Sequence, residues 1–177
     1  MQELVGEGAG GVENVLGGEK STTMVWLLSL LGLSVVLPFF NLQLVTGPLI
    51  NAILFIATVV LGWKKTLWIC LFPSVIAFSV GLLPAILGPM IPFIMIGNMI
   101  LVVVFNPLWR KNWWLGVGAA SFLKFLFLFG MSRLLFGLIL RQSLPAAVAD
   151  TLAWPQLYSA LIGGVLAYLF LKFVKRI

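Results

Sequence analysis

Isolated polar side chains inside long apolar runs are the groups in this sequence best suited to chemistry. Asn51, Asn98 and Arg133 each stand among hydrophobic residues. The chain has no acidic residue between Glu19 and Asp150, and it has no His at all. Amides and a guanidinium without a carboxylate or an imidazole can hold a ligand through hydrogen bonds and charge, but they are poorly suited to acid–base catalysis. The pattern therefore indicates binding rather than catalysis.

Metal and cofactor chemistry lacks its usual residues. Structural zinc, iron–sulfur clusters and haem need several His or Cys ligands. The single Cys, Cys70, lies in an apolar stretch, and we interpret it as a small buried residue. The sequence contains no HExxH motif, no phosphate-binding glycine loop and no Ser, His and Asp set. We therefore expect no enzyme activity, no cofactor and no metal site.

Composition places the polar groups in a membrane protein. Hydrophobic residues make up 62% of the 177 residues and charged residues only 9%, whereas soluble chains carry about 25% charged residues. The net charge is +6, but the basic residues stand at the ends of apolar runs. Such residues lie at the bilayer surface and set topology. The sequence therefore predicts a lipid bilayer as its surroundings and no nucleic-acid partner.

Six apolar runs are long enough to span about 30 Å of hydrocarbon as helices. We predict an all-α membrane protein, a six-transmembrane-helix bundle over residues 23–177. The glycine-rich acidic segment 1–22 is predicted to be a flexible N-terminal tail. Proline at 84, 89 and 92 predicts a bend over Leu83 to Ile91. The expected helices run from about Met24 to Phe40, Gly47 to Trp63, Thr66 to Leu83, Met90 to Phe105, Trp113 to Leu140 and Thr151 to Val174.

Basic residues mark every second connection between the expected helices. The alternate connections carry none, except Arg141, which is accompanied by Asp150. Because basic residues near a membrane remain on the cytoplasmic side, the N and C termini are both expected to be cytoplasmic. Several tryptophans, Trp113 among them, stand beside the same boundary, and nearly all of the tryptophans are interpreted as lipid anchors. The basic residues that set this orientation are Lys20, Lys64, Lys65, Arg110, Lys111, Lys172, Lys175 and Arg176.

Polar side chains gather toward the opposite, outer side of this arrangement. The inner half of the expected bundle is almost purely apolar apart from its flanking charges. Because polar groups in a bilayer are costly, they normally face a bundle interior, a cavity or a partner. We therefore predict an outward-facing pocket for a small polar molecule. The candidate ligand-binding residues are Asn41, Gln43, Asn51, Asn98, Arg133, Gln156 and Tyr158.

The two cations of the fifth expected helix have open interpretations. Arg133 either contacts an anionic or polar group of a ligand, or snorkels outward or pairs with Asp150. Lys124 lies nine residues earlier, which at about 100° per residue places it on the opposite helix face. Lys124 is expected either to snorkel or to contact another subunit.

Small residues four apart form stripes on the last two expected helices. Gly116 and Ala120 form one pair, and Ser159 and Gly163 form another. Such spacing lets helices approach closely. The stripes indicate either packing within the bundle or a surface between subunits.

Two segments that contain Gly and Pro end in the asparagines described above. The segments Thr46-Gly-Pro-Leu-Ile-Asn51 and Leu87-Gly-Pro-Met-Ile-Pro-Phe-Ile-Met-Ile-Gly-Asn98 resemble the substrate-binding S components of energy-coupling factor (ECF) transporters. The resemblance by motif covers about Phe39 to Phe105, and it points to a subgroup whose ligand is uncharacterised.

The resemblance implies a substrate-capture subunit of an ATP-driven importer in the cytoplasmic membrane of a prokaryote. Its ligand would be a vitamin or related micronutrient. Its partners would be a transmembrane coupling subunit and cytoplasmic ATPases, whose ATP hydrolysis delivers the substrate inward. Many members carry an alanine-x-x-x-alanine motif on the first helix, where this chain has only Ser29, Gly32 and Ser34 as small residues. Docking to a coupling subunit would therefore use different residues here.

A second function class fits the same sequence. The chain could anchor or scaffold a larger membrane complex without transporting anything, using the small-residue stripes as contact surfaces. An occluded or missing outer pocket would favour this alternative. A stand-alone channel is disfavoured, because no continuous polar stripe reaches the inner side.

Overall fold

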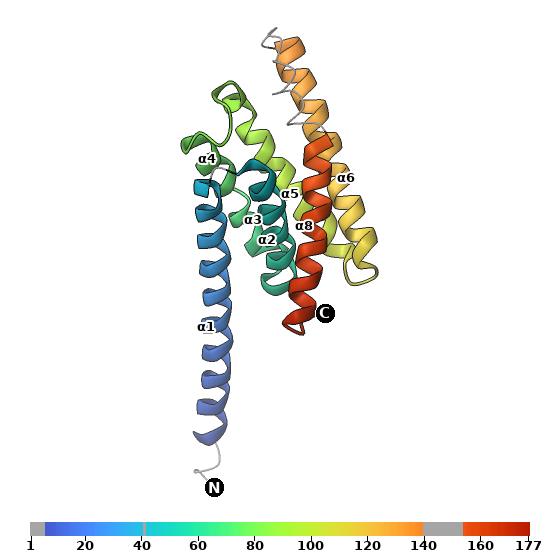
Figure 1. Ribbon diagram of the computed structural model, residues 1–177. Helices are drawn as coiled ribbons and strands as arrows, with labels where there is room; N and C mark the ends of the chain where they lie inside the picture. The colour runs from blue at the N-terminus through green and yellow to red at the C-terminus, as the bar shows by residue number, and fades with distance from the viewer. Residues whose placement is uncertain (1–5, 41, 140–153) are drawn as a thin grey trace.

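Every element of the described chain is a helix. The computed structural model describes residues 6–40, 42–139 and 154–177, and its longer helices run up and down in the view of Figure 1. The elements are α1 (Gly6–Val36), η1 (Leu37–Phe40), α2 (Gln43–Leu61), α3 (Trp63–Ile69), α4 (Phe72–Ser79), η2 (Ala85–Met90), α5 (Ile91–Leu108), α6 (Trp113–Ser132), the π-helical segment η3 (Arg133–Ile139) and α8 (Trp154–Phe173).

Five helical stretches within the described residues are long and apolar enough to cross a membrane. This finding agrees with the predicted multi-pass, all-α membrane protein. The stretches also match five of the six expected runs. They are Ser21–Phe40, Leu44–Leu61, Ala85–Leu108, Trp113–Gly137 and Trp154–Phe173.

The third expected helix is broken into the two short helices α3 and α4. The break falls at Cys70 and Leu71, directly before Pro73 in the first turn of α4. Proline has no N–H to donate to the carbonyl group four residues earlier, and its ring clashes with that carbonyl. A continuous helix over this run was therefore a wrong expectation. The number of crossings consequently depends on whether α3 and α4 together count as one.

The path of the chain brings its two described ends to the same side. The chain turns back into α3 after Gly62, whose φ of 81° ends α2 and suits glycine. From there α3 and α4 lead back to the end at which α2 begins (Figure 1). The start of α1 and the end of α8 therefore lie at the same end of the molecule (Figure 1).

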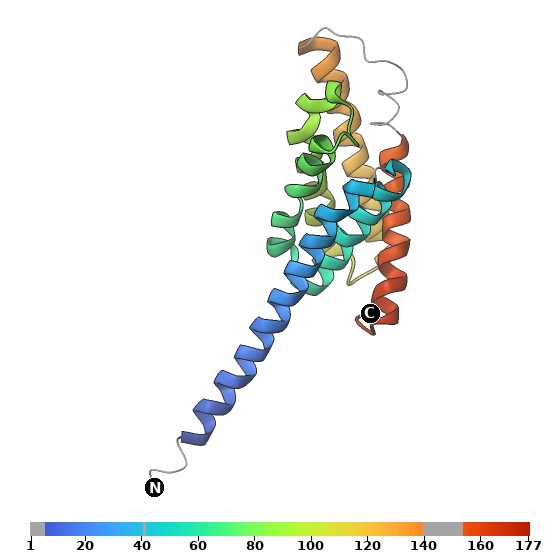
Figure 2. The same ribbon diagram turned by 60° about the vertical axis from the view of Figure 1, so that its left-hand side comes forward.

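The first helix begins earlier than expected. It starts at Gly6 rather than near Met24, and its first part projects beyond the other helices (Figure 2). The predicted boundary at residue 22 therefore falls inside α1. The remainder of α1 packs against α2, α3 and α4.

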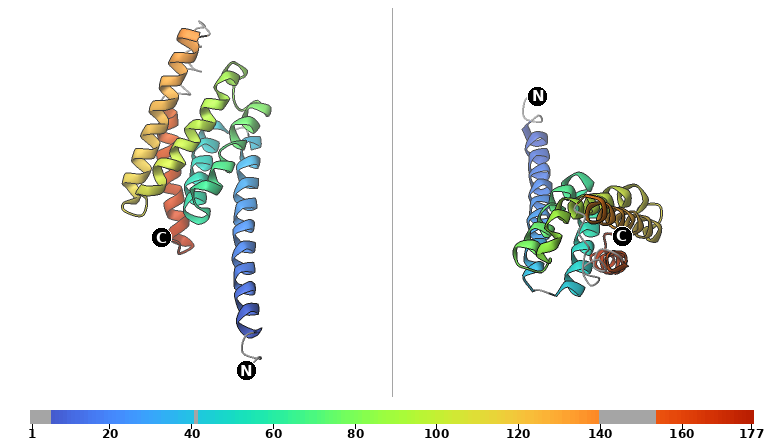
Figure 3. Two further views of the ribbon diagram at one scale, coloured as in Figure 1. Left: turned by 180° about the vertical axis from the view of Figure 1, so that it is seen from behind. Right: turned by 90° about the horizontal axis from the view of Figure 1, so that it is seen from above.

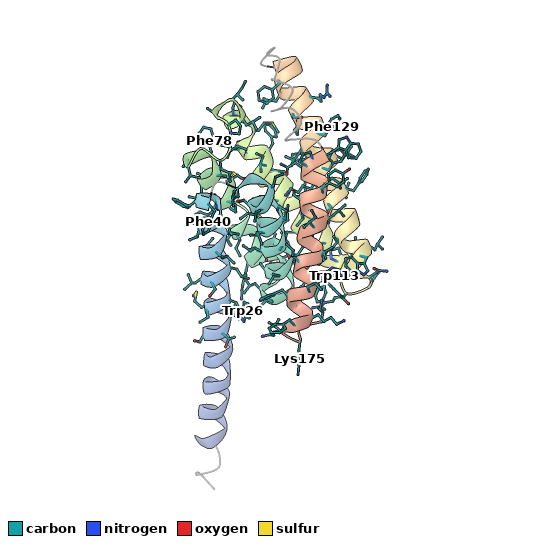
Figure 4. All side chains as sticks on the ribbon, in the orientation of Figure 1. Trp26, Phe40, Phe78, Trp113, Phe129 and Lys175 are labelled. Carbon is teal, nitrogen blue, oxygen red and sulfur yellow. The ribbon has the colours of Figure 1, made fainter. Side chains whose placement is uncertain are left out.

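Seven of the basic residues that follow α1 lie at one end of the bundle, here called the basic end. The α2–α3 junction, the α5–α6 connection and the end of α8 all lie there (Figure 1). Side chains confirm the direction, since Trp113 and Lys175 lie toward this end and Phe129 toward the other (Figure 4). The residues concerned are Lys64, Lys65, Arg110, Lys111, Lys172, Lys175 and Arg176.

Close helix contact depends on two glycines of α8, which packs mainly against α2 and also against α6 (Figure 3). A Cβ atom added at Gly163 would lie 2.7 Å from the carbonyl oxygen of Pro48 and 2.9 Å from the backbone nitrogen of Ala52. At Gly164 it would collide with the side chain of Val117. The stripe that contains Gly163 therefore packs inside the bundle.

Trp113 has a packing role in addition to its place near the boundary. It is buried, and its indole N–H donates to the carbonyl oxygen of Gly164 at 3.3 Å. Its ring also meets Phe105 edge-on, with centroids 5.1 Å apart. Trp113 is therefore an exception to the interpretation of the tryptophans as lipid anchors, because its polar N–H finds its partner inside the bundle.

We expect Gly163→Ala to lower the thermal unfolding midpoint of the purified protein, because the new methyl group meets backbone that cannot rotate away. The expected loss is about 1–3 kcal/mol, as for other overpacked interiors. Gly118→Ala on α6 is the matched control, since nothing lies within 4 Å of its added Cβ and alanine favours the helix. Equal midpoints for the two variants would contradict the close contact of α2 and α8.

Candidate functional site

A buried lysine forms the centre of the site. Lys124 on α6 is only 3% exposed. Its Nζ donates to Oδ1 of Asn51 on α2 at 2.7 Å and to Oδ1 of Asn98 on α5 at 2.8 Å. The two asparagines are 2% and 3% exposed. Three helices therefore place a cation and two amides in direct contact within the bundle.

The hydrogen bonds continue to α8. Nδ2 of Asn51 donates to the carbonyl oxygen of Gly47 at 3.0 Å and to Oγ of Ser159 at 3.3 Å. Ser159 in turn donates from Oγ to the carbonyl oxygen of Gln156 at 3.1 Å. These bonds direct the Asn51 amide oxygen at Lys124, because its nitrogen is already committed. We call Asn51, Asn98, Lys124 and Ser159 the polar cluster.

The polar cluster contains a cation but no acid. Residues 20–149 and 151–177 contain no Asp or Glu, so none of the helices that meet at Lys124 carries one next to it. Burying an ammonium group among apolar helices is costly unless it is paired. Two amide oxygens reduce that cost, but within the part of the chain that the structure describes no acidic side chain pairs with the charge.

The polar cluster lies at the edge of a cavity of about 420 Å³. Apolar side chains form much of the wall, including the rings of four prolines from η1, α2, α4 and α8. A few polar groups in a largely apolar hollow of this size are typical of small-molecule sites. The polar lining consists of Thr46, Asn51, Ser74, Asn98, Lys124, Gln156, Tyr158 and Ser159.

The exposure of the lining residues indicates the side on which the cavity opens. Leu44 in the first turn of α2 is 88% exposed and Tyr158 near the start of α8 is 58% exposed, whereas Lys124 is almost fully buried. The helices α2 and α8 both start at the end opposite the basic end (Figure 1). The rim therefore lies toward that opposite end, and the polar cluster forms the floor.

Four of the residues predicted from the sequence line this cavity. They are Asn51, Asn98, Gln156 and Tyr158. Asn41 lies outside the described residues, and Gln43 is the first residue of α2 but its side chain also lies outside them. The structure thus brings together candidates from three separate runs of the sequence.

Arg133 lies apart from these four. It is exposed and does not line the cavity, and its guanidinium carbon lies 5.2 Å from the ring centroid of Phe129. Its neighbours Gly130 and Gly137 have open space beside them. The alternative partner Asp150 lies outside the described residues.

Lys124 is the site residue that the sequence reasoning missed. It neither snorkels nor faces outward, so both of its expected roles are wrong. The helical period did separate it correctly from Arg133, since one is buried and the other exposed. A usable signal was present, because Gly116, Ala120 and Lys124 follow one another at intervals of four, and small residues mark the packed face of a membrane helix.

Comparisons of the chain with protein-family models, with curated proteins and with solved structures gave no match. The resemblance to S components of ECF transporters therefore stays a prediction. The polar cluster and its cavity carry the functional argument.

We expect Asn98→Leu to destabilise the protein more than Lys124→Met does. The first change leaves a buried ammonium group with one acceptor fewer, at a cost of about 1–3 kcal/mol. The second removes the charge itself and retains an unbranched side chain of similar length. Thermal unfolding of both variants in the same detergent measures the order. A larger loss for Lys124→Met would mean that the lysine serves mainly to hold the helices together.

Proposed function

We propose that this chain is a substrate-capture membrane subunit, which binds a small polar solute in an outward-facing cavity and delivers it as part of an ATP-driven importer of the ECF type. The observation that carries the proposal is the polar cluster at the floor of the cavity. A buried cation held by two asparagines is costly in a bilayer, and a protein that only needs to pack could use apolar residues instead.

The direction of the cavity supports capture from outside the cell. Its rim lies opposite the basic end, where seven basic residues flank the helices, and basic residues near a membrane are cytoplasmic. We propose that α3 and α4 together make the third of six crossings, with both termini in the cytoplasm of a prokaryotic cell. A coupling subunit in the membrane and cytoplasmic ATPases would supply the energy, because the chain itself shows no nucleotide-binding motif.

We expect native mass spectrometry of the gently solubilised protein to reveal a bound small molecule in the cavity. Ala77→Trp should remove this adduct, because Ala77 lines the cavity and an indole would fill part of its volume. Val75→Trp on the same short helix is the matched control, since Val75 is exposed and does not line the cavity. The control should keep the adduct.

The same spectra distinguish the proposal from its alternative. Coupling and ATPase subunits in the released complex would support an importer. A stable complex that contains no ATPases, and in which this protein carries no bound small molecule, would instead favour the scaffolding role. An adduct that persists unchanged in Ala77→Trp would contradict binding in this cavity.

We expect cysteine labelling in intact cells to report the proposed topology. In a Cys70→Ala background, Ser79→Cys at the end of α4 should react with a membrane-impermeant maleimide. Lys111→Cys in the α5–α6 connection should react only after the membrane is permeabilised. Both positions are exposed, so accessibility depends on the side of the membrane. The reverse pattern would place the cavity on the cytoplasmic side.

A further inference from the structure

The floor of the cavity has hydrogen-bond donors to spare. A lysine ammonium group has three N–H bonds, and Lys124 uses two of them on Asn51 and Asn98. Within the described residues, no acceptor takes the third. The side-chain nitrogen of Asn98 likewise donates to no described residue. Both residues line the cavity and are about 97% buried.

The acceptors at the same floor each already accept one hydrogen bond from a described side chain. The amide oxygens of Asn51 and Asn98 both accept from Lys124. The hydroxyl oxygen of Ser159 accepts from Asn51 and donates to Gln156. A ligand group that reaches this floor therefore meets oxygens that already accept one hydrogen bond, N–H bonds that lack an acceptor among the described residues, and a positive charge. Such a surface favours an acceptor that carries negative charge.

We propose that the ligand is a small organic anion whose single carboxylate lies against Lys124 and Asn98. This inference rests on the proposed capture function and specifies its ligand class. The carboxylate would accept the third N–H of Lys124 and an N–H of Asn98, and it would supply the counter-ion that residues 20–149 of the chain lack. A buried charge is retained at least cost when it is paired and hydrogen-bonded.

The walls above the floor define the rest of the ligand. Pro48, Pro73 and Ile94 are among the apolar residues that line the cavity. A largely apolar body fits these walls, which offer neutral polar groups but no second charged side chain among the described lining residues. The volume of about 420 Å³ lies in the range of about 300–1,000 Å³ typical of small-molecule pockets. The predicted ligand is thus amphipathic, with its anionic end innermost.

Three probes with the same ring and different head groups test this inference. Benzoate, benzamide and benzylammonium are titrated separately against the full chain in lipid nanodiscs at neutral pH, and binding is followed by saturation-transfer NMR with empty nanodiscs subtracted. We expect benzoate to bind about tenfold more tightly than benzamide, the ratio that one charge-assisted contact typically provides. Benzylammonium should show no saturable binding.

Two variants locate the effect. Lys124→Met should reduce benzoate binding to the level of benzamide while the protein remains folded. Lys65→Met removes an exposed ammonium group at the basic end, and it should leave the preference for benzoate unchanged. Asn98→Leu should weaken the binding of benzoate. Benzylammonium should show no saturable binding to this variant either.

Each outcome decides the inference. Equal binding of benzoate and benzamide, tighter binding of benzylammonium, or a preference for benzoate that survives Lys124→Met overturns it. The absence of binding by all three probes overturns it as well. The capture function fails separately, when native mass spectrometry finds no adduct that Ala77→Trp removes. A bound molecule that carries no negative charge would therefore contradict the proposed ligand class but would still support the capture function.

Discussion

The need to satisfy one buried ammonium group organises the structure around Lys124. Lys124 is almost fully buried, so two of its three N–H bonds find their acceptors on neighbouring helices. Asn51 supplies one from α2 and Asn98 another from α5. Ser159 then fixes the Asn51 amide from α8. A rotation of any one of these helices would separate a donor from its acceptor, and the cost of that loss is high in apolar surroundings. Four helices are therefore held in register by polar contacts, while apolar packing alone leaves rotation loosely specified.

Close packing and the polar cluster depend on each other. A Cβ atom at Gly163 would lie 2.7 Å from Cβ of Asn51, so the absence of a side chain lets α8 approach the very turn of α2 that carries this amide. Ser159, one turn earlier on α8, is thereby brought within reach of Asn51. The Gly47 carbonyl accepts from the same amide. Small residues thus do more than allow helices to touch, because they set the distance at which the hydrogen bonds of the site can form.

Hydropathy predicted the helices well and the orientation of their faces poorly. The long apolar runs identified five of the helices. The remaining run breaks at Cys70 because Pro73 cannot continue a helix, and the length of the run alone does not show this. Asn51 and Asn98 stood out because few side chains in these runs carry an amide. For Lys124 and Arg133, in contrast, hydropathy could not say which faced inward, because both the bundle interior and the lipid around it are apolar. Only the small residues Gly116 and Ala120 distinguished the packed face. Contacts with Asn41 or Asp150 lie outside the described residues.

The packing beneath the polar cluster constrains how a bound molecule could leave. Toward the basic end, Phe55 and Phe105 follow Asn51 and Asn98 on their helices and are fully buried, with ring centroids 4.7 Å apart. Phe105 also meets Trp113, which in turn contacts Tyr168 with centroids 5.6 Å apart. This aromatic layer joins α2, α5, α6 and α8 below the cavity. Interiors packed in this way are not continuously deformable, so a solute at Lys124 has no passive path through the layer. Under the proposed function, inward release would therefore require the helices to separate or the whole subunit to reorient. A cavity open on one side and closed by aromatic packing on the other thus fits a subunit that must change conformation to release a solute better than it fits a channel.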